Sequence, residues 1–169
     1  MSRPRTVLAL DIASVSGWAV GPIGVPPLLG SVKLIGKGVE DGAIGAAFID
    51  FVTDHIELFH PHVVAYEAAL PYGQHKGAKA GMLAFGLIML LKVVCWRRGL
   101  SCVPGNVSTV RAQVLGNGHA QKSDVVAWVQ EQGWRLPEVF GAPDEDAADA
   151  AALWAFSSGI RHPSKRRAA

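Results

Sequence analysis

The 169-residue sequence predicts an α/β fold in which a mixed sheet of five strands carries helices on both faces. This prediction rests on the order of the apolar segments along the chain: three short strands come first, and helices then alternate with strands. Half of the residues are hydrophobic and 18% are charged, which excludes a disordered or fibrous chain. The net charge of +2 also excludes a strongly basic, histone-like DNA-binding protein.

The first three strands are expected at residues 6–10, 16–20 and 28–35. The first of these, TVLAL, is apolar throughout, which is typical of a strand buried on both faces of a sheet. Only short links separate the three runs, and such links favour antiparallel neighbours. This part of the chain therefore predicts an antiparallel meander.

The remaining elements alternate between helix and strand. Ile44, Phe48, Phe51, Val52 and Ile56 follow the spacing of one helical face. The expected helices are residues 41–59, 78–98, 108–115, 122–132 and 146–158, and the expected strands are residues 62–66 and 101–104. A loop containing glycine and proline is expected at residues 136–143, and the tryptophans are expected in the core.

The apolar run at residues 80–91 lies between two lysines. Its twelve uncharged residues would span only about 18 Å as a helix, and a bilayer core needs about twenty residues. We therefore expect this helix in the core or at a subunit interface. The N-terminal apolar run is too short for a signal peptide, so we expect a cytoplasmic protein without a membrane partner.

Four acidic residues lie on elements that the predicted fold should bring together at one edge of the sheet. Asp11 ends the first strand, Glu67 ends the fourth, and Asp146 and Asp149 are spaced i, i+3 on the last helix. If the first and fourth strands are parallel neighbours, Asp11 and Glu67 lie side by side at the carboxyl edge of the sheet. Clustered carboxylates repel one another unless cations lie between them, and their oxygens suit Mg²⁺ or Mn²⁺.

Each acid alone also has an ordinary structural explanation. Asp11 could be a turn or cap residue, Glu67 could form a salt bridge, and acids at a helix start complement the helix dipole. Asp149 is harder to explain in this way, because alanines surround it on an apolar helix. The combination of two strand-end acids with a helical DxxD is more specific than any of its parts.

Four sequence blocks, LALDIASVSGWAV, VVAYEAAL, GNGHAQK and DEDAADAAALWAF, resemble the RuvC family of Holliday junction resolvases. The resemblance spans residues 7–156 and implies an RNase H-like fold and crossover junction endodeoxyribonuclease activity. The family's catalytic and metal-binding acids fall on Asp11, Glu67, Asp146 and Asp149, and its lysine after a Gly-x-Gly segment falls on Lys122. The resemblance also implies a homodimer, with the helix at residues 78–98 contributing to the interface.

The resemblance further implies contacts with branched DNA, above all four-way junctions. A second family lysine aligns with Arg111, which keeps the charge but changes the geometry. The candidate DNA-binding residues are Arg111, Lys122, Lys76, Lys79, Tyr72 and His119. Small residues follow Glu67 where the family often has a bulky one, and Tyr72 is the nearest aromatic side chain. We expect one nuclease domain at residues 1–160 and a flexible basic tail at residues 161–169.

The expected chemistry is phosphodiester hydrolysis that leaves a 5′-phosphate and a 3′-hydroxyl. Two Mg²⁺ ions, or Mn²⁺ in their place, would be held by the four acids, and Lys122 would offset charge on the scissile phosphate. A nucleotide kinase is excluded, because 169 residues cannot hold two actin-like domains. Two alternatives stay open: a protein that binds branched DNA without cutting it, and another RNase H-like nuclease, such as one acting on RNA–DNA hybrids.

Overall fold

The computed structural model describes residues 4–34, 38–69 and 78–163. Its main sheet has the strand order β3-β2-β1-β4-β5. The bounds are β1 Thr6–Asp11, β2 Val15–Pro22, β3 Leu28–Lys33, β4 Val63–Glu67 and β5 Ser101–Gly105. The first three strands pair antiparallel, whereas β4 pairs parallel with both β1 and β5. The predicted mixed sheet of five strands is confirmed.

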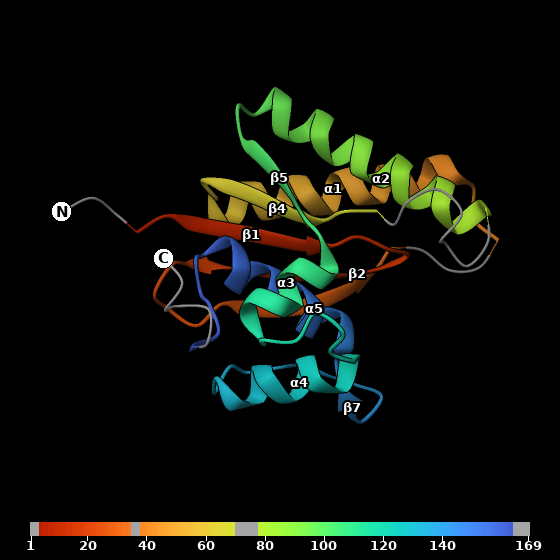
Figure 1. The fold of residues 1–169 in the computed structure, drawn as a ribbon. Helices are drawn as coiled ribbons and strands as arrows, with labels where there is room; N and C mark the ends of the chain where they lie inside the picture. Colours follow the sequence, from red (N-terminus) through yellow and green to blue (C-terminus); the bar gives the residue numbers. More distant parts are fainter. Residues whose placement is uncertain (1–3, 35–37, 70–77, 164–169) are drawn as a thin grey trace.

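Helices cover both faces of this sheet, as predicted (Figure 1). Their bounds are α1 Asp41–Phe59, α2 Ala78–Arg97, α3 Val107–Val114, α4 Lys122–Glu131 and α5 Glu145–Ser157. The helices α1 and α2 lie on one face, and α5 crosses the other face in contact with β1, β2 and β3. The helix α4 packs on the outside of α5 and forms a further layer.

The central strand β1 supplies both halves of the core. Val7 and Ala9 pack in the cluster that includes α5, whereas Leu8 and Leu10 pack in the cluster that includes α1 and α2. All four side chains are fully buried, which follows from the alternation of side chains along a strand. This packing fixes β1 between the two helical layers and places its last residue, Asp11, at the edge of the sheet.

A small hairpin stands where we predicted a loop. The strands β6 (Glu138–Val139) and β7 (Ala142–Pro143) pair antiparallel just before α5. Two residues per strand are too few to produce a detectable alternation, so sequence periodicity could not find them. Phe140 and Gly141 form the tip, with positive φ angles of 52° and 79°.

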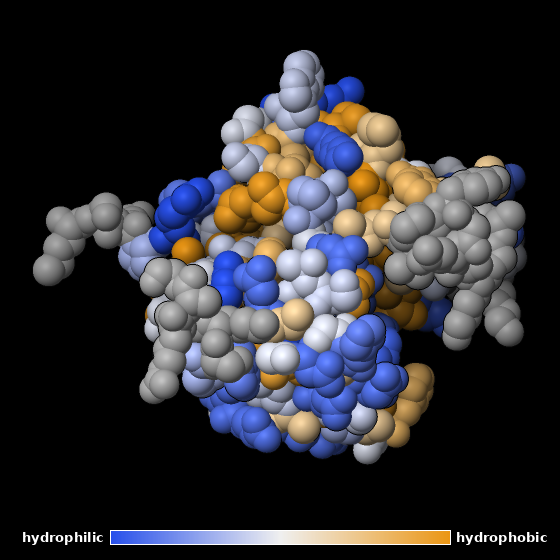
Figure 2. All heavy atoms as spheres, viewed as in Figure 1, coloured by the Kyte–Doolittle hydropathy of each residue, from blue (hydrophilic) through white to orange (hydrophobic). Residues whose placement is uncertain are grey.

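The helix α2 carries a stripe of exposed apolar side chains. Five of its large side chains are exposed at a spacing that keeps them on one side: Met82, Phe85, Met89, Val93 and Trp96. Figure 2 shows orange surface in the upper region that α2 occupies in Figure 1. Trp96 is 83% exposed, so its predicted core position is wrong, whereas Trp154 is buried as expected.

The segment Lys79–Arg97 of α2 is also long and apolar enough to cross a membrane, judged by length and composition alone. Only 28% of that window is buried, because one side of the helix packs on α1 and β5 while the stripe faces outward. A helix at a subunit interface has the same composition.

The structure describes residues 161–163 of the expected basic tail. The Arg161 guanidinium donates to the carbonyls of Phe156 and Ile160 at 2.8 Å, and the backbone N–H of His162 donates to the carbonyl of Gln113 at 2.7 Å. These bonds join the first two residues of the expected tail to the domain. Residues 164–169 lie outside the described part of the chain.

Candidate active site

The sheet brings Asp11 and Glu67 together. The parallel register pairs Leu10 of β1 with Tyr66 of β4, so the next residue on each strand is one of the two acids. Both side chains are only partly exposed. The charge of Glu67 is one of the causes that raise the pKa of Asp11. The prediction that the two strand ends meet is confirmed.

The helix α5 carries the other two acids to the same edge. Asp144 caps this helix, since its carboxylate accepts a hydrogen bond from the backbone N–H of Ala147 at 3.0 Å. Gly17 on β2 permits the approach, because a Cβ at this position would collide with the main-chain carbonyl of Asp146. Glycine inside a strand often marks such close backbone contact. The missing side chain of Gly17 thus lets Asp146 lie directly over the sheet.

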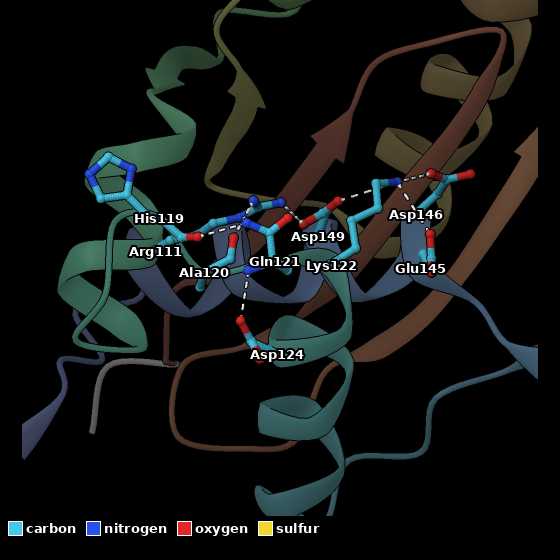
Figure 3. Close-up of polar contacts among 9 residues, drawn as sticks. All are labelled: Arg111, His119, Ala120, Gln121, Lys122, Asp124, Glu145, Asp146 and Asp149. Carbon is cyan, nitrogen blue, oxygen red and sulfur yellow. Dashed lines mark hydrogen bonds and ion pairs between the residues drawn. The ribbon is translucent and has the colours of Figure 1, made fainter.

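Lys122, the first residue of α4, reaches across to α5 (Figure 3). Its ammonium donates to Asp146 at 3.2 Å and lies 3.6 Å from a carboxylate oxygen of Asp149. Glu145 is a weaker neighbour at 3.8 Å, and sequence analysis did not include it in the site. Lys122 remains 47% exposed, so its ammonium can move toward a bound phosphate.

Arg111 on α3 forms the more buried ion pair of the site. Its guanidinium donates to Asp149 at 2.9 Å and to the backbone carbonyl of Ala120 at 2.7 Å (Figure 3). The side chains of Arg111 and Asp149 are only 17% and 9% exposed. Arg111 therefore ties α3 and the segment before α4 to the face of α5 that carries Asp149, a connection that sequence analysis did not predict.

Burial and neighbouring charges shift the pKa values of Asp11, Glu67 and Lys122. Burial raises the pKa of Asp11 well above its usual value, and the charges of Glu67, Asp149 and Asp146 raise it further. Burial and the charge of Asp149 raise the pKa of Glu67 to about 7, although Arg111 and Lys122 oppose this change. Partial burial lowers the pKa of Lys122, but its hydrogen bond to Asp146 and the neighbouring acids outweigh this effect and raise it. The site thus holds more negative charge than its two cations neutralise.

We predict that the protein without metal loses stability as the pH rises from about 4.5 to about 7. The pKa of Glu67 is about 7 when folded and has an ordinary value of 4.5, so the folded state binds the proton more tightly. The contribution of Glu67 is fully present below about pH 4.5 and is lost by about pH 7. In thermal unfolding with EDTA, the melting temperature of Glu67→Gln should decrease less over this pH range than that of the wild-type protein. An equal decrease in both proteins would contradict the assigned pKa.

The carboxylate oxygens of the four acids are the kind of ligand that a hard divalent cation prefers. Four carboxylates lie at one edge of the sheet, and burial together with the charges of neighbouring acids raises the pKa values of Asp11 and Glu67. As the side chains lie, no three Asp, Glu, His or Cys residues among those described are grouped tightly enough to hold an ion. Instead, Lys122 lies against Asp146 and Asp149, and Arg111 is paired with Asp149. Asp11, Glu67, Asp146 and Asp149 would hold the metal once Lys122 moves aside.

The DNA-binding candidates differ in position. Lys122 lies in the site, whereas the ring of His119 points away from the acids in Figure 3. Lys79 is exposed in the first turn of α2. Tyr72 and Lys76 lie outside the described residues. Contact of these residues with DNA stays a prediction.

If the chain has the junction-cutting activity that the resemblance implies, Arg111→Met should lower cleavage by about 10- to 100-fold, a usual effect of removing a group that orients a metal ligand. Junction affinity should change less than twofold, because the guanidinium is bonded inside the protein. Arg111→Lys should be intermediate, since one ammonium cannot reproduce the planar fork. A large loss of affinity with a weaker salt dependence would show instead that Arg111 contacts DNA phosphate.

The fold is similar to those of solved resolvase structures. A Thermus thermophilus RuvC structure aligns with a TM-score of 0.66 and 21% identity, over 94% of this chain and 99% of that one. T. thermophilus RuvC in complex with a Holliday junction substrate aligns with a TM-score of 0.69 and 22% identity, over 91% and 94%. The yeast mitochondrial Holliday junction resolvase Ydc2 aligns with a TM-score of 0.63 and 14% identity, over 94% and 79%.

No protein-family model and no curated protein matches this sequence. The structural similarity extends over nearly the whole chain, although the identities are low. The chain therefore has the RuvC-like, RNase H-like α/β fold that the four sequence blocks predicted.

Proposed function

We propose that the protein is a structure-selective endonuclease that resolves four-way DNA junctions by metal-dependent, paired nicking. The observation that carries this proposal is the convergence of Asp11, Glu67, Asp146 and Asp149 at one edge of the sheet, with Lys122 against two of them. The similarity to a RuvC structure in complex with a Holliday junction substrate supports branched DNA as the substrate class.

The chain's own residues orient the reacting groups. Asp11 and Glu67 are fixed by the strand ends, and Arg111 holds one oxygen of Asp149. When bound, a divalent cation supplies an activated water and neutralises charge on the phosphate. Lys122, released from Asp146 and Asp149, donates to a nonbridging oxygen of the scissile phosphodiester. Water adds to phosphorus and the 3′-oxygen leaves with a proton, giving a 5′-phosphate and a 3′-hydroxyl.

We also propose that the protein acts as a homodimer joined through the α2 stripe. Resolution of a four-way junction needs one cut in each of two strands, and one chain supplies one group of four acids. Two copies related by a two-fold axis would place two such sites on one junction. The exposed residues of the stripe, including Phe85 and Met89, would then be buried against the same surface of the partner.

The direct test is cleavage of an end-labelled, immobile four-way junction in Mg²⁺, beside a linear duplex of the same sequence. We expect symmetric nicks in the junction alone and none with Asp146→Asn. Ligation of the products would confirm 5′-phosphate and 3′-hydroxyl ends. Tight junction binding without cutting in Mg²⁺ or Mn²⁺ would overturn the nuclease in favour of an architectural protein. Preferred cutting of an RNA–DNA hybrid would overturn the junction assignment.

A further inference from the structure

Cys95 and Cys102 are the two cysteines of the sequence, and the fold brings them together. Cys95 lies in the last turn of α2 and is 1% exposed, whereas Cys102 lies on β5 and is partly exposed. Their spacing along the chain does not match the CxxC motif of redox proteins. The sequence alone therefore gives no sign that the two thiols meet.

A tight turn joins the end of α2 to β5 (Figure 1). Gly99 follows the helix with a positive φ of 65°, and the backbone N–H of Leu100 donates to the carbonyl of Cys95 at 2.9 Å. A glycine in this conformation is a common end of an α-helix. The turn leads the chain directly into β5, which packs against α2.

The register of β5 directs Cys102 toward the helix. Cys102 pairs with Val64 of the parallel strand β4, and paired residues of neighbouring strands point to the same face of a sheet. Val64 is buried in the half of the core that α1 and α2 cover, which also contains Cys95, and Cys102 packs against this same group. The two side chains therefore approach each other from the helix and the strand, and their thiols are hydrogen-bonded.

The two thiols differ in acidity. The hydrogen bond from the Cys95 thiol lowers the pKa of Cys102, and the positive charge of Lys92 lowers it further, although burial opposes both effects. The same hydrogen bond and burial raise the pKa of Cys95. Because the thiolate is the reactive form of cysteine, Cys102 is the more reactive of the two. It is also the one that solvent can reach.

Neither core packing nor metal binding accounts for this pair. Packing explains Cys95, since a buried free cysteine behaves as a small apolar side chain. It does not explain Cys102, which is partly exposed and lies near the charge of Lys92. In the described part of the chain, no three His, Cys, Asp or Glu residues are grouped to hold a metal ion.

We propose that Cys95 and Cys102 form a reversible disulfide within one chain when the protein meets a peroxide. Cys102 is the thiol that the peroxide oxidises first, and Cys95 is the thiol that resolves the oxidised form. A partly exposed, acidic cysteine beside a second thiol is the arrangement typical of redox-sensitive sites. This site lies away from the four acids and is independent of the proposed nuclease activity.

The chemistry balances with hydrogen peroxide as the oxidant. The Cys102 thiolate attacks one peroxide oxygen, so that an S–O bond forms, the O–O bond breaks, and the leaving hydroxide takes up the proton that Cys102 had lost. The Cys95 sulfur then attacks the sulfur of the Cys102 sulfenic acid, the S–O bond breaks, and the hydroxide leaves as water with the Cys95 proton. Two thiols and one peroxide thus give one disulfide and two waters. A dithiol reduces the bond again by exchange.

The direct test uses the full wild-type chain, treated with hydrogen peroxide and then unfolded in N-ethylmaleimide. Intact mass spectrometry should show a chain that has lost two hydrogens and carries no maleimide. Treatment with dithiothreitol before the alkylation should restore two maleimides per chain. Because the chain has two cysteines in all, no other thiol can produce this result.

Single serine variants test the two roles and serve as controls for each other. Cys95→Ser should leave the oxidised Cys102 without a resolving thiol, so its sulfenic acid should be trapped by dimedone. Cys102→Ser should remain fully alkylatable after the same treatment, because Cys95 is buried. Trapping by dimedone in Cys102→Ser but not in Cys95→Ser would overturn the assigned order.

Two results with the wild-type protein would overturn the pair itself. One is two maleimides per chain after peroxide treatment, which would show that the thiols do not react. The other is a disulfide between two chains, which appears as a doubled mass on a non-reducing gel. Neither measurement depends on the folding of a variant or on DNA cleavage, so a failure here and a failure of the proposed function are distinct.

Discussion

Replacing Asp11 with asparagine is expected to abolish cleavage while making the metal-free protein more stable. Asp11 lies at the centre of the site, where burial and the charges of Glu67, Asp149 and Asp146 raise its pKa. Asparagine has the same shape but no charge, so it removes this repulsion together with a metal ligand. We expect cleavage to decrease at least a thousandfold, which corresponds to about 4 kcal/mol in transition-state stabilisation, and the melting temperature in EDTA to rise by a few degrees.

The two effects are measured by junction cleavage in Mg²⁺ and by thermal unfolding in EDTA above about pH 7. Asp50→Asn on α1 is the control, since this carboxylate is exposed and lies outside the group of four. It should change neither quantity. A loss of cleavage accompanied by a lower melting temperature would show that Asp11 is needed for folding, and the account of a repulsive acidic site would then be wrong.

The second large effect is expected from substitutions in the α2 stripe, which should change the oligomeric state. Phe85→Glu combined with Met89→Glu should convert a dimer to a monomer at micromolar concentration, because each glutamate would have to be buried unpaired against apolar surface. Cutting of the two opposing strands should then become uncoupled. Sedimentation velocity gives the oligomeric state, and Leu58→Glu on α1 is the control, because Leu58 is 71% exposed and does not belong to the stripe.

Two outcomes would contradict the dimer. One is a wild-type protein that sediments as a monomer at tens of micromolar. The other is a double variant that remains dimeric, which would move the interface to another surface. A requirement for detergent that the double variant removes would show that the stripe of α2 contacts lipid, as its length and composition also permit.

Much of the fold could be predicted because burial leaves a strong periodic pattern. The run at residues 6–10 is apolar on both sides, and the structure buries Val7 and Leu8 in opposite halves of the core. Strand ends also follow from such runs, so it could be expected that Asp11 and Glu67 follow the paired residues Leu10 and Tyr66. The β6–β7 hairpin could not be predicted, because two-residue strands carry no period and Phe140 is unusual in its turn.

The polar connections within the site were harder to predict than its acids. The charge of Arg111 is visible in the sequence, but its bonds to Ala120 and Asp149 depend on how α3 packs against α5. Glu145 enters the site only because Lys122 extends between two helices. Gly17 is different, since glycine inside a strand is a signal for close backbone approach that the sequence does contain.

The central claim is that one dimer cuts two opposing strands of a junction. A supercoiled plasmid that extrudes a cruciform tests it directly, because paired cuts within one binding event give linear DNA and single cuts give nicked circles. We predict linear product from the earliest times in Mg²⁺, and nicked circles from the Phe85→Glu, Met89→Glu variant. Nicked circles alone from the wild-type protein, or equal cutting of a plasmid without the cruciform, would contradict the account.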